Sequence, residues 1–290
     1  MLEKLRDILQ CPECQNEIKI HPHEIVCQTC LKQFPIKNNV PLFSIEEIEK
    51  KGLITTPEKQ ILYNLKEKFP VLTLLPKLLK TPSLKYLTRG KDRLESYVKN
   101  IANNPEAIIL DIGAGRKKYP ETITLDLYHY PDIDLCANAE KLPLKDNSVD
   151  MVLNTSAMEH MVNIDKILTE MDRVLKSGGF IFVATPFVFP YHPQPFDLTR
   201  WSADGLKHLF PNYTCLESGS VRGPHATLHR VISSYFAWLF SLGNYPIYLF
   251  LYMVFSWVFL PLGILDALHG QYRQKQSPLD CIVYFIGQKP

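Results

Sequence analysis

The sequence has no long run of basic residues, no internal repeat and no low-complexity tract, and its formal net charge is only +2. Proteins that grip nucleic acid through phosphates concentrate positive charge, so we expect no strong preference for polyanions, and nucleic acid is not an expected partner. The first residues also lack the apolar core of a secretory signal. We therefore expect the protein in the cytoplasm, or on the cytoplasmic side of the cell membrane.

Cysteine is sparse, with seven among 290 residues. Four of them form two C-x-x-C pairs, Cys11/Cys14 and Cys27/Cys30, and the other three are scattered, which favours a reducing compartment over a disulfide framework. Each pair can present two thiolates to one tetrahedral zinc ion. Because residues 1–44 bury too little to fold without metal, we predict a zinc ribbon there with a structural ion.

Charge is absent altogether from residues 231–265, which are rich in Phe, Tyr and Trp. The segment around Gly243 and Pro246 divides this stretch into two pieces, so we predict an apolar helical hairpin over residues 231–268. Such a hairpin favours association with a membrane, with Trp and Tyr at the interface. A buried cap or a homo-oligomer interface is the alternative.

Two apolar strands are each followed by polar ligand-binding candidates. The run ending at Leu110 leads to Asp111, Gly113 and Gly115, and the next strand ends in Asp126. Glycines let the backbone approach a ligand closely, Asp111 can accept bonds from a cationic amino group, and a carboxylate at the second strand tip can hold a ribose diol. The short connection between Gly115 and Asp126 leaves too little room for the usual first helix.

These residues, followed by Ser148-Val-Asp150 and Gly178-Gly179, resemble the class I S-adenosylmethionine-dependent methyltransferases, especially the branch acting on small molecules and lipids. The resemblance implies an α/β fold, a Rossmann-like seven-stranded mostly parallel sheet, here with a reduced first helix. It implies S-adenosylmethionine as cofactor, its carboxylate end meeting Arg116 or Lys117, where Lys117 replaces the family's third glycine. The cofactor-binding residues that it implies are Asp111, Gly113, Gly115, Asp126, Asn138, Ala139 and Asn154.

The segment after the fifth predicted strand is a proline-rich loop that carries His192, Asp197 and Arg200. It resembles a bacterial methyltransferase subgroup tied to cell-envelope biosynthesis. We predict His192 as the base for a hydroxyl acceptor, Asp197 as its orienting partner and Arg200 as a contact for an anionic group. His160 is a further catalytic candidate. Alternatively, Asp197 and Arg200 form a local ion pair, and Glu159 with His160 caps the following helix.

The N-terminal cysteine segment resembles the zinc ribbon of the small activator proteins of tRNA methyltransferases. We predict five regions: 1–44 zinc ribbon, 45–105 helical linker, 106–230 methyltransferase core, 231–268 apolar helical hairpin inserted before the last strand, and 269–290 return to the core with the final strand. The function predicted is methyl transfer to a hydroxyl of a lipid-linked or amphipathic envelope precursor. An rRNA or tRNA methyltransferase, or a non-catalytic partner with this fold, is the alternative.

Overall fold

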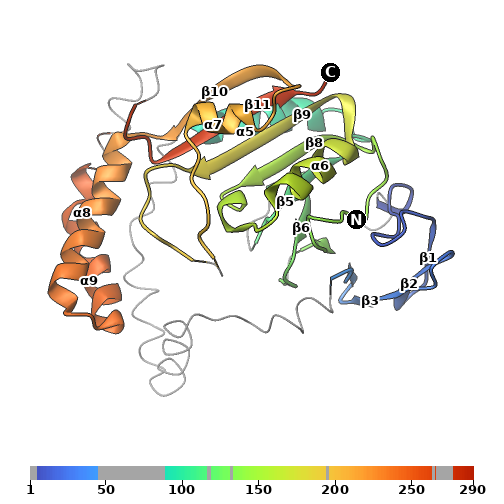
Figure 1. Cartoon of the computed structure of the whole chain (residues 1–290), viewed down its shortest axis with the longest axis horizontal. Helices are drawn as coiled ribbons and strands as arrows, with labels where there is room; N and C mark the ends of the chain where they lie inside the picture. Colours follow the sequence, from blue (N-terminus) through green and yellow to red (C-terminus); the bar gives the residue numbers. More distant parts are fainter. Residues whose placement is uncertain are drawn as a thin grey trace.

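The computed structural model describes residues 5–44, 89–115, 119–130, 133–193, 196–262, 265 and 277–290 (Figure 1). Near the N-terminus a small antiparallel sheet has the order β1-β2-β3-β4. Its strands are β1 (Ile18–Ile20), β2 (Glu24–Cys27), β3 (Gln33–Lys37) and β4 (Val40–Pro41). The predicted linker over residues 45–105 is described only from residue 89 onward.

The large sheet has seven strands in the order β10-β11-β9-β8-β5-β6-β7. The strands are β5 (Ile109–Ile112), β6 (Ile123–Asp126), β7 (Leu135–Cys136), β8 (Val149–Thr155), β9 (Leu175–Pro186), β10 (Thr214–Arg222) and β11 (Ile282–Gln288). Strand β11 runs antiparallel to both of its neighbours, β9 and β10, and the pairs among β5 to β9 are parallel. The predicted Rossmann-like, mostly parallel sheet is therefore confirmed.

Strand order reverses next to β5, because β6 and β7 extend the sheet on one side of it and β8 and β9 on the other. At such a switch point the connections after neighbouring strands leave toward opposite faces, which opens a crevice at their carboxyl ends. The residues that follow β5, β6 and β8 therefore surround the place where an open α/β sheet binds its ligand.

Alternate side chains of the strands pack on the two faces of the sheet. Helix α6 (Ile164–Val174) covers one face, where it packs with Leu110 and Val152 in one core cluster. Helix α5 (Arg89–Ala102) covers the other, with Leu94 packed beside Met151. The described part of the predicted linker is thus a helix that belongs to the core of the sheet domain.

The connection from β5 to β6 contains only turns in its described residues, 113–115 and 119–122. This agrees with a reduced first helix. Arg116 and Lys117, expected near the carboxylate end of the cofactor, lie outside the described residues.

The N-terminal module is attached to the edge of the large sheet. Leu42 forms a parallel bridge with Cys136 of β7, and Leu9 forms an antiparallel bridge with Leu144. Leu5 and Leu9 are buried in the same core cluster as α6. The N-terminal residues therefore form part of the hydrophobic core of the sheet domain, so the two modules share stability.

Two helices, α8 (Pro224–Ser241) and α9 (Tyr245–Val258), follow β10 and pack against each other, for example through Phe236 and Phe255. They stand at the end of the molecule opposite the small N-terminal sheet (Figure 1). Helix α8 begins before the predicted boundary at residue 231. Among the described helices, none combines the length and the apolar character needed to cross a bilayer.

Candidate functional site

The turn after β5 depends on two glycines with left-handed backbone conformations, Gly113 at φ +75° and Gly115 at φ +61°. A Cβ on Gly113 would lie 2.4 Å from the Cβ of Ala157, whereas a Cβ on Gly115 would meet nothing within 4 Å. A glycine is thus required at position 113, because the turn packs closely against the segment after β8. Gly115 leaves open space beside the backbone, which is where a ligand can approach closely.

Asp126 connects this turn to the second strand. Its Oδ2 accepts a hydrogen bond from the N–H of Gly115 at 2.8 Å, and its Oδ1 accepts one from the N–H of Tyr128 at 3.0 Å. Burial raises the pKa of Asp126, and these backbone bonds oppose that shift. A carboxylate can accept about four hydrogen bonds, so Asp126 keeps the capacity to accept two hydroxyls of a ribose.

Asn154 at the end of β8 is fully buried. Its Nδ2 donates to the carbonyl of Ile112 at 3.0 Å, and its Oδ1 accepts from the N–H of Met158 at 3.1 Å. These bonds hold the end of β5 against η3 (Met158–His160), a short 3-10 helix. Asn154 therefore shapes the predicted cofactor crevice through the backbone on both sides of it.

The remaining predicted cofactor residues lie along the same carboxyl edge. Asp111 is almost entirely buried near the end of β5. The segment after β7 is tied to β6 by a hydrogen bond from Ala137 N–H to the Asp126 carbonyl at 2.9 Å. Within it, Asn138 accepts the N–H of Glu140 through Oδ1 at 2.9 Å, and Ala139 packs into the core. The fold thus brings the predicted residues to neighbouring strand ends.

The predicted catalytic residues of the loop after β9 also come together. The side chain of Asp197 is buried, accepts the backbone N–H of His192 at 2.9 Å and binds Arg200 through its Nη1 and Nη2 atoms. Burial opposes ionisation of Asp197, but the bonds from Arg200 and His192 prevail and bring its pKa to about 2. The His192 Nδ1 lies 3.3 Å from Asp197 Oδ2. Asp197 therefore both contacts the imidazole and forms the local ion pair.

Glu159 is a functional candidate that was not among the predicted catalytic residues. Its side chain is fully buried, and its Oε1 lies 3.7 Å from the Nε2 of His160 and 3.7 Å from the Nε2 of His192. Helix α6 instead starts after Asn163, with no side-chain cap. Glu159 and His160 therefore do not cap that helix. In the sequence, the only signal was an acidic residue next to a histidine after the end of a strand. His192 comes close to these two residues only in the folded structure.

Helix α8 contacts the same loop. The ring of Phe189 lies 4.6 Å from the His192 ring, measured between centroids, and the Arg230 guanidinium lies 4.7 Å from the Phe189 centroid. Thr227 of α8 also donates to the carbonyl of Leu279 at 2.7 Å. The base of the α8 and α9 pair therefore adjoins the predicted catalytic loop.

The four N-terminal cysteines converge, and their sulfur atoms all lie within 4.8 Å of one another. The Sγ atoms of Cys11 and Cys30 are 3.6 Å apart, and those of Cys14 and Cys27 are 3.4 Å apart. A tetrahedral zinc site with Zn–S bonds of about 2.3 Å separates its sulfurs by about 3.8 Å. Backbone N–H groups of Thr29 and Cys30 point at Cys27 Sγ, each at 3.4 Å. This donor set fits zinc.

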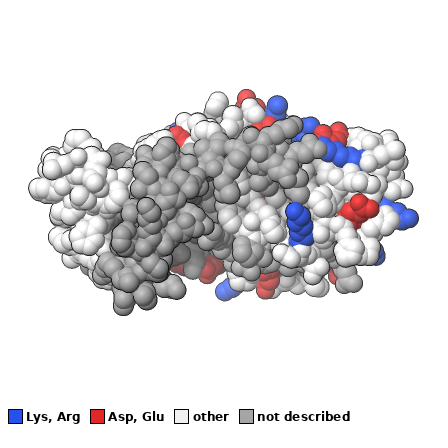
Figure 2. All heavy atoms as spheres, turned by 90° about the horizontal axis from the view of Figure 1, so that it is seen from below, with Lys and Arg blue, Asp and Glu red and all other residues white. Residues whose placement is uncertain are grey.

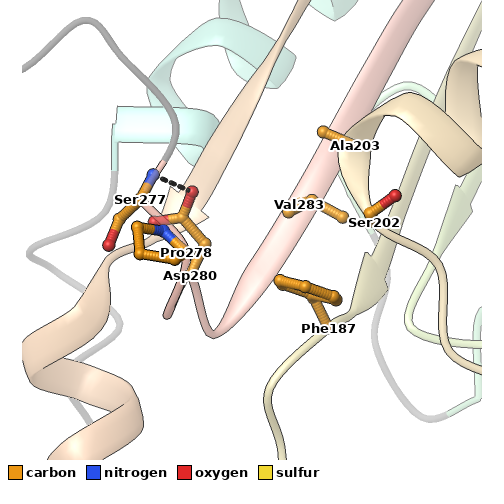
Figure 3. A pocket seen from close by; sticks show the side chains of 7 residues that line it. All are labelled: Phe187, Ser202, Ala203, Ser277, Pro278, Asp280 and Val283. Carbon is orange, nitrogen blue, oxygen red and sulfur yellow. Dashed lines mark hydrogen bonds between the residues drawn. The ribbon is translucent and has the colours of Figure 1, made fainter.

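A cavity of about 230 Å³ lies between the ends of β9 and β11 and the start of α7 (Ala203–His208) (Figure 3). It is lined by Phe187, Ser202, Ala203, Ser277, Pro278, Asp280 and Val283. None of the predicted site residues lines it. The candidate active site is therefore defined by the strand ends and the loop after β9, and not by this cavity.

The sheet domain is similar in sequence to a known family. Residues 110–183 match the family model described as a methyltransferase domain. The sheet domain has the class I S-adenosylmethionine-dependent methyltransferase fold.

Three curated relatives show the extent of this similarity. An uncharacterized protein of Methanocaldococcus jannaschii is 28% identical over 42% of this chain and 64% of its own length. A probable S-adenosylmethionine-dependent methyltransferase of Mycobacterium tuberculosis is 34% identical over 28% of this chain and 32% of its own. A ubiquinone/menaquinone biosynthesis C-methyltransferase of Hahella chejuensis is 29% identical over 39% and 46%. The chain thus spans less than two thirds of each relative.

Proposed function

We propose that this protein is an S-adenosylmethionine-dependent methyltransferase whose acceptor is a hydroxyl, or a similar nucleophile, on a lipid-linked or amphipathic cell-envelope precursor. The observation that carries the proposal is the direct contact between the predicted catalytic loop and α8, through Phe189 and Arg230. This contact supports the proposal, because the proposed chemistry would then lie beside an apolar surface from which such an acceptor can be taken.

The cofactor would be held at the carboxyl ends of β5, β6 and β7. S-adenosylmethionine, when bound, supplies a methyl group on a positively charged sulfur. Asp126 would accept the ribose hydroxyls, and Gly115 would let the backbone approach them. Asp111 would hold the positive amino group through its carboxylate. The curated relatives named as methyltransferases support this assignment.

Acceptor activation would fall to the loop after β9. The Nδ1 of His192 faces the Pro190 carbonyl at 3.1 Å, so its Nε2 is the ring atom free to take a proton from a hydroxyl. Asp197 keeps the imidazole in place, and Arg200 keeps Asp197 ionised. Positioning contributes most to an in-line displacement, so this fixed geometry is the main catalytic contribution of the chain.

The surface of α8 and α9 supports an amphipathic acceptor. On the face that the space-filling view presents, the end of the molecule that these helices form carries no Lys, Arg, Asp or Glu (Figure 2). Trp238, Phe250 and Trp257 are about half exposed or more, and Leu242 at the tip is 92% exposed. Exposed aromatic and aliphatic side chains on a helix favour binding at a membrane interface. We propose that this pair rests on the cytoplasmic face of the membrane.

In the proposed function, the zinc ribbon has a structural role. We propose that Cys11, Cys14, Cys27 and Cys30 hold one zinc ion, with no position left for water, so that the ion stabilises the fold and takes no part in methyl transfer.

The decisive test is a calorimetric titration of the purified full chain with S-adenosylmethionine, followed by transfer of labelled methyl groups to membrane lipid extracts. Saturable binding with labelling of a lipid-extractable product supports the proposal. Binding without any labelled lipid would overturn the acceptor class, and absence of binding would overturn the enzyme assignment.

Membrane attachment is tested by flotation with phospholipid vesicles. Leu242 and Leu31 are both highly exposed leucines in the left-handed conformation, one at the tip of the helix pair and one in the zinc ribbon. Asn tolerates that conformation, so Leu242→Asn and Leu31→Asn form a matched pair. We expect only Leu242→Asn to weaken flotation, by about 10–100-fold, since burying a leucine is worth roughly 1.5–3 kcal/mol. Equal flotation of both variants would contradict the proposed surface.

A further inference from the structure

Glu159 is a buried carboxylate without the hydrogen bonds that such a group normally needs. Its side chain is fully buried, and within the described residues neither of its oxygens has a hydrogen-bond partner. A buried charge is stabilised by an opposite charge or by a metal ion. The negative charge of Glu159 contributes to raising the pKa of Arg200, but the Nη1 and Nη2 atoms of Arg200 both bind Asp197.

The two neighbouring histidines direct lone pairs toward this carboxylate. The Nδ1 of His160 contacts the carbonyl of Phe196, and the Nδ1 of His192 contacts the carbonyl of Pro190 at 3.1 Å. A carbonyl oxygen only accepts hydrogen bonds, so both contacts favour the tautomer with the proton on Nδ1. At His192 the Asp197 Oδ2, 3.3 Å from Nδ1, favours it as well, while the donor Arg200 Nη2 lies farther away, at 3.4 Å. Each Nε2 then presents its lone pair. Metal-binding histidines use this arrangement, with the second ring nitrogen donating to a backbone carbonyl or a carboxylate.

The three inward-facing atoms have the spacing of metal ligands. Each Nε2 lies 3.7 Å from Oε1 of Glu159, and the three atoms lie within 4.8 Å of one another. A separation of 3.7 Å is too long for a hydrogen bond. Ligands about 2.0–2.2 Å from a tetrahedral ion lie about 3.4 Å apart, so a small adjustment of the side chains suffices.

We propose that Glu159, His160 and His192 bind a divalent transition-metal ion, such as Zn²⁺, Fe²⁺ or Ni²⁺, where the segment after β8 meets the loop after β9. Two imidazoles favour these ions over Mg²⁺ and Ca²⁺, which take oxygen ligands. Three protein ligands leave at least one position open, as in catalytic metal sites. The site is separate from the four-cysteine cluster and differs from it in ligand chemistry.

Such an ion changes the part played by His192. An acceptor hydroxyl bound at the open position would release its proton to bulk water more readily, because the ion would stabilise the alkoxide, and His192 would then be a ligand rather than the base. This role rests on the proposed methyltransferase function, whereas binding of the ion does not.

The experiment is equilibrium dialysis of the metal-free full chain against Co²⁺, with the bound metal counted by mass spectrometry and its absorption spectrum recorded. We expect two ions per wild-type chain: one with the intense sulfur-to-cobalt bands of a four-thiolate site, and one with only the weak bands of nitrogen and oxygen ligands. Cys14→Ser should lose the first signature and keep the second.

Glu159→Gln should bind one ion and keep the thiolate bands, while Glu140→Gln, a half-buried glutamate outside the cluster, should bind two. A single ion in the wild type, with thiolate bands alone, overturns the proposal even if Glu159→Gln fails to fold. S-adenosylmethionine binding, measured on the same wild-type samples, shows separately whether the proposed function fails.

Discussion

Asp126 accepts a hydrogen bond from the backbone N–H of Gly115 at 2.8 Å, which joins the end of β6 to the glycine turn after β5. In this fold a helix normally follows that turn and positions it. Here the described residues of the connection form only turns, so the Asp126 carboxylate holds the turn in place. The Asp126 side chain thus holds the turn beside the predicted cofactor crevice. It is also the best candidate in that crevice for contacting a ribose.

The first prediction concerns this double role. Asp126→Asn keeps one carbonyl oxygen as acceptor but removes the charge, and we expect S-adenosylmethionine affinity to fall about 10–100-fold, because hydrogen bonds to a charged group are worth about 1.5–3 kcal/mol. Calorimetry checks this. Asp134→Asn is the matched control, since Asp134 Oδ2 accepts the N–H of Thr124 at 2.9 Å and supports the same strand. Equal affinity in the two variants would contradict the ribose contact.

Acid should weaken cofactor binding through the same carboxylate. Burial raises the pKa of Asp126 despite the opposing backbone bonds. Accepting two ribose hydroxyls requires the ionised form, so affinity is full above the raised pKa and declines as the pH falls through it. We expect this decline at a higher pH than the usual aspartate range near 3.9. Titrations between pH 7 and pH 4 test it, and an unchanged affinity down to about pH 4 would exclude Asp126 as the controlling group.

The next prediction separates packing from backbone conformation. Gly113 and Gly178 have nearly the same φ, +75° and +76°, but only at Gly113 would a Cβ collide, 2.4 Å from Ala157. Gly178→Ala should cost about 1–2 kcal/mol of unfolding free energy for the left-handed conformation. Gly113→Ala should cost about 1–3 kcal/mol more, because the overlap forces η3 away from the turn. Denaturant unfolding of both variants measures the difference, and equal losses would refute the close approach.

Much of the sheet was predictable because its signals are local. The apolar strands, the acids at their ends and the glycine turns each occupy a few consecutive residues. The fold confirms that β6 ends at Asp126, whereas β5 continues one residue past Asp111, to Ile112. The short span between Gly115 and Asp126 likewise indicated the reduced helix. Nothing local in the sequence showed that Leu5 and Leu9 enter the sheet core, since their partners lie far along the chain.

The candidate site was predicted less completely. His192, Asp197 and Arg200 are near neighbours in sequence, and their mutual contacts follow from the loop. The cluster of Glu159 with His160 and His192 forms only when the segments after β8 and β9 meet. Its key member, Glu159, belongs to no periodic or regularly spaced pattern in the sequence. Its burial in the folded structure is what marks it as a functional candidate.

A fourth prediction tests the structural zinc. Cys14→Ser should lose one zinc ion per chain and lower the melting temperature of the whole sheet domain, because Leu5 and Leu9 next to the ribbon belong to the shared core. Cys215→Ser, at a half-buried cysteine of β10 outside the cluster, is the control and should keep its zinc. Metal analysis and calorimetry read out the two effects. Loss of zinc without any change in melting would show that the ribbon and the sheet are independent.

The last prediction concerns the pH dependence of the α8 and α9 pair. His229 of α8 is buried, and its Nε2 donates to the carbonyl of Ser256 in α9 at 2.9 Å. Burial lowers the pKa of His229, and the charge of Arg230 adds to this, while the bond to Ser256 opposes it. The folded state therefore binds a proton less readily than the unfolded chain. The contribution of His229 to the free energy of unfolding is complete above about pH 6.5 and is lost as the pH falls below that value.

We expect the melting temperature of the wild type to drop between pH 7 and pH 5 more steeply than that of His229→Gln, whose amide can still donate to Ser256 but takes no proton. His225→Gln, one turn earlier on α8, should follow the wild-type profile. Parallel profiles for all three proteins would show that His229 does not couple the two helices to pH. A reduced slope in His229→Gln alone would instead locate acid sensitivity in the contact that holds α9 against α8, next to the loop that carries His192.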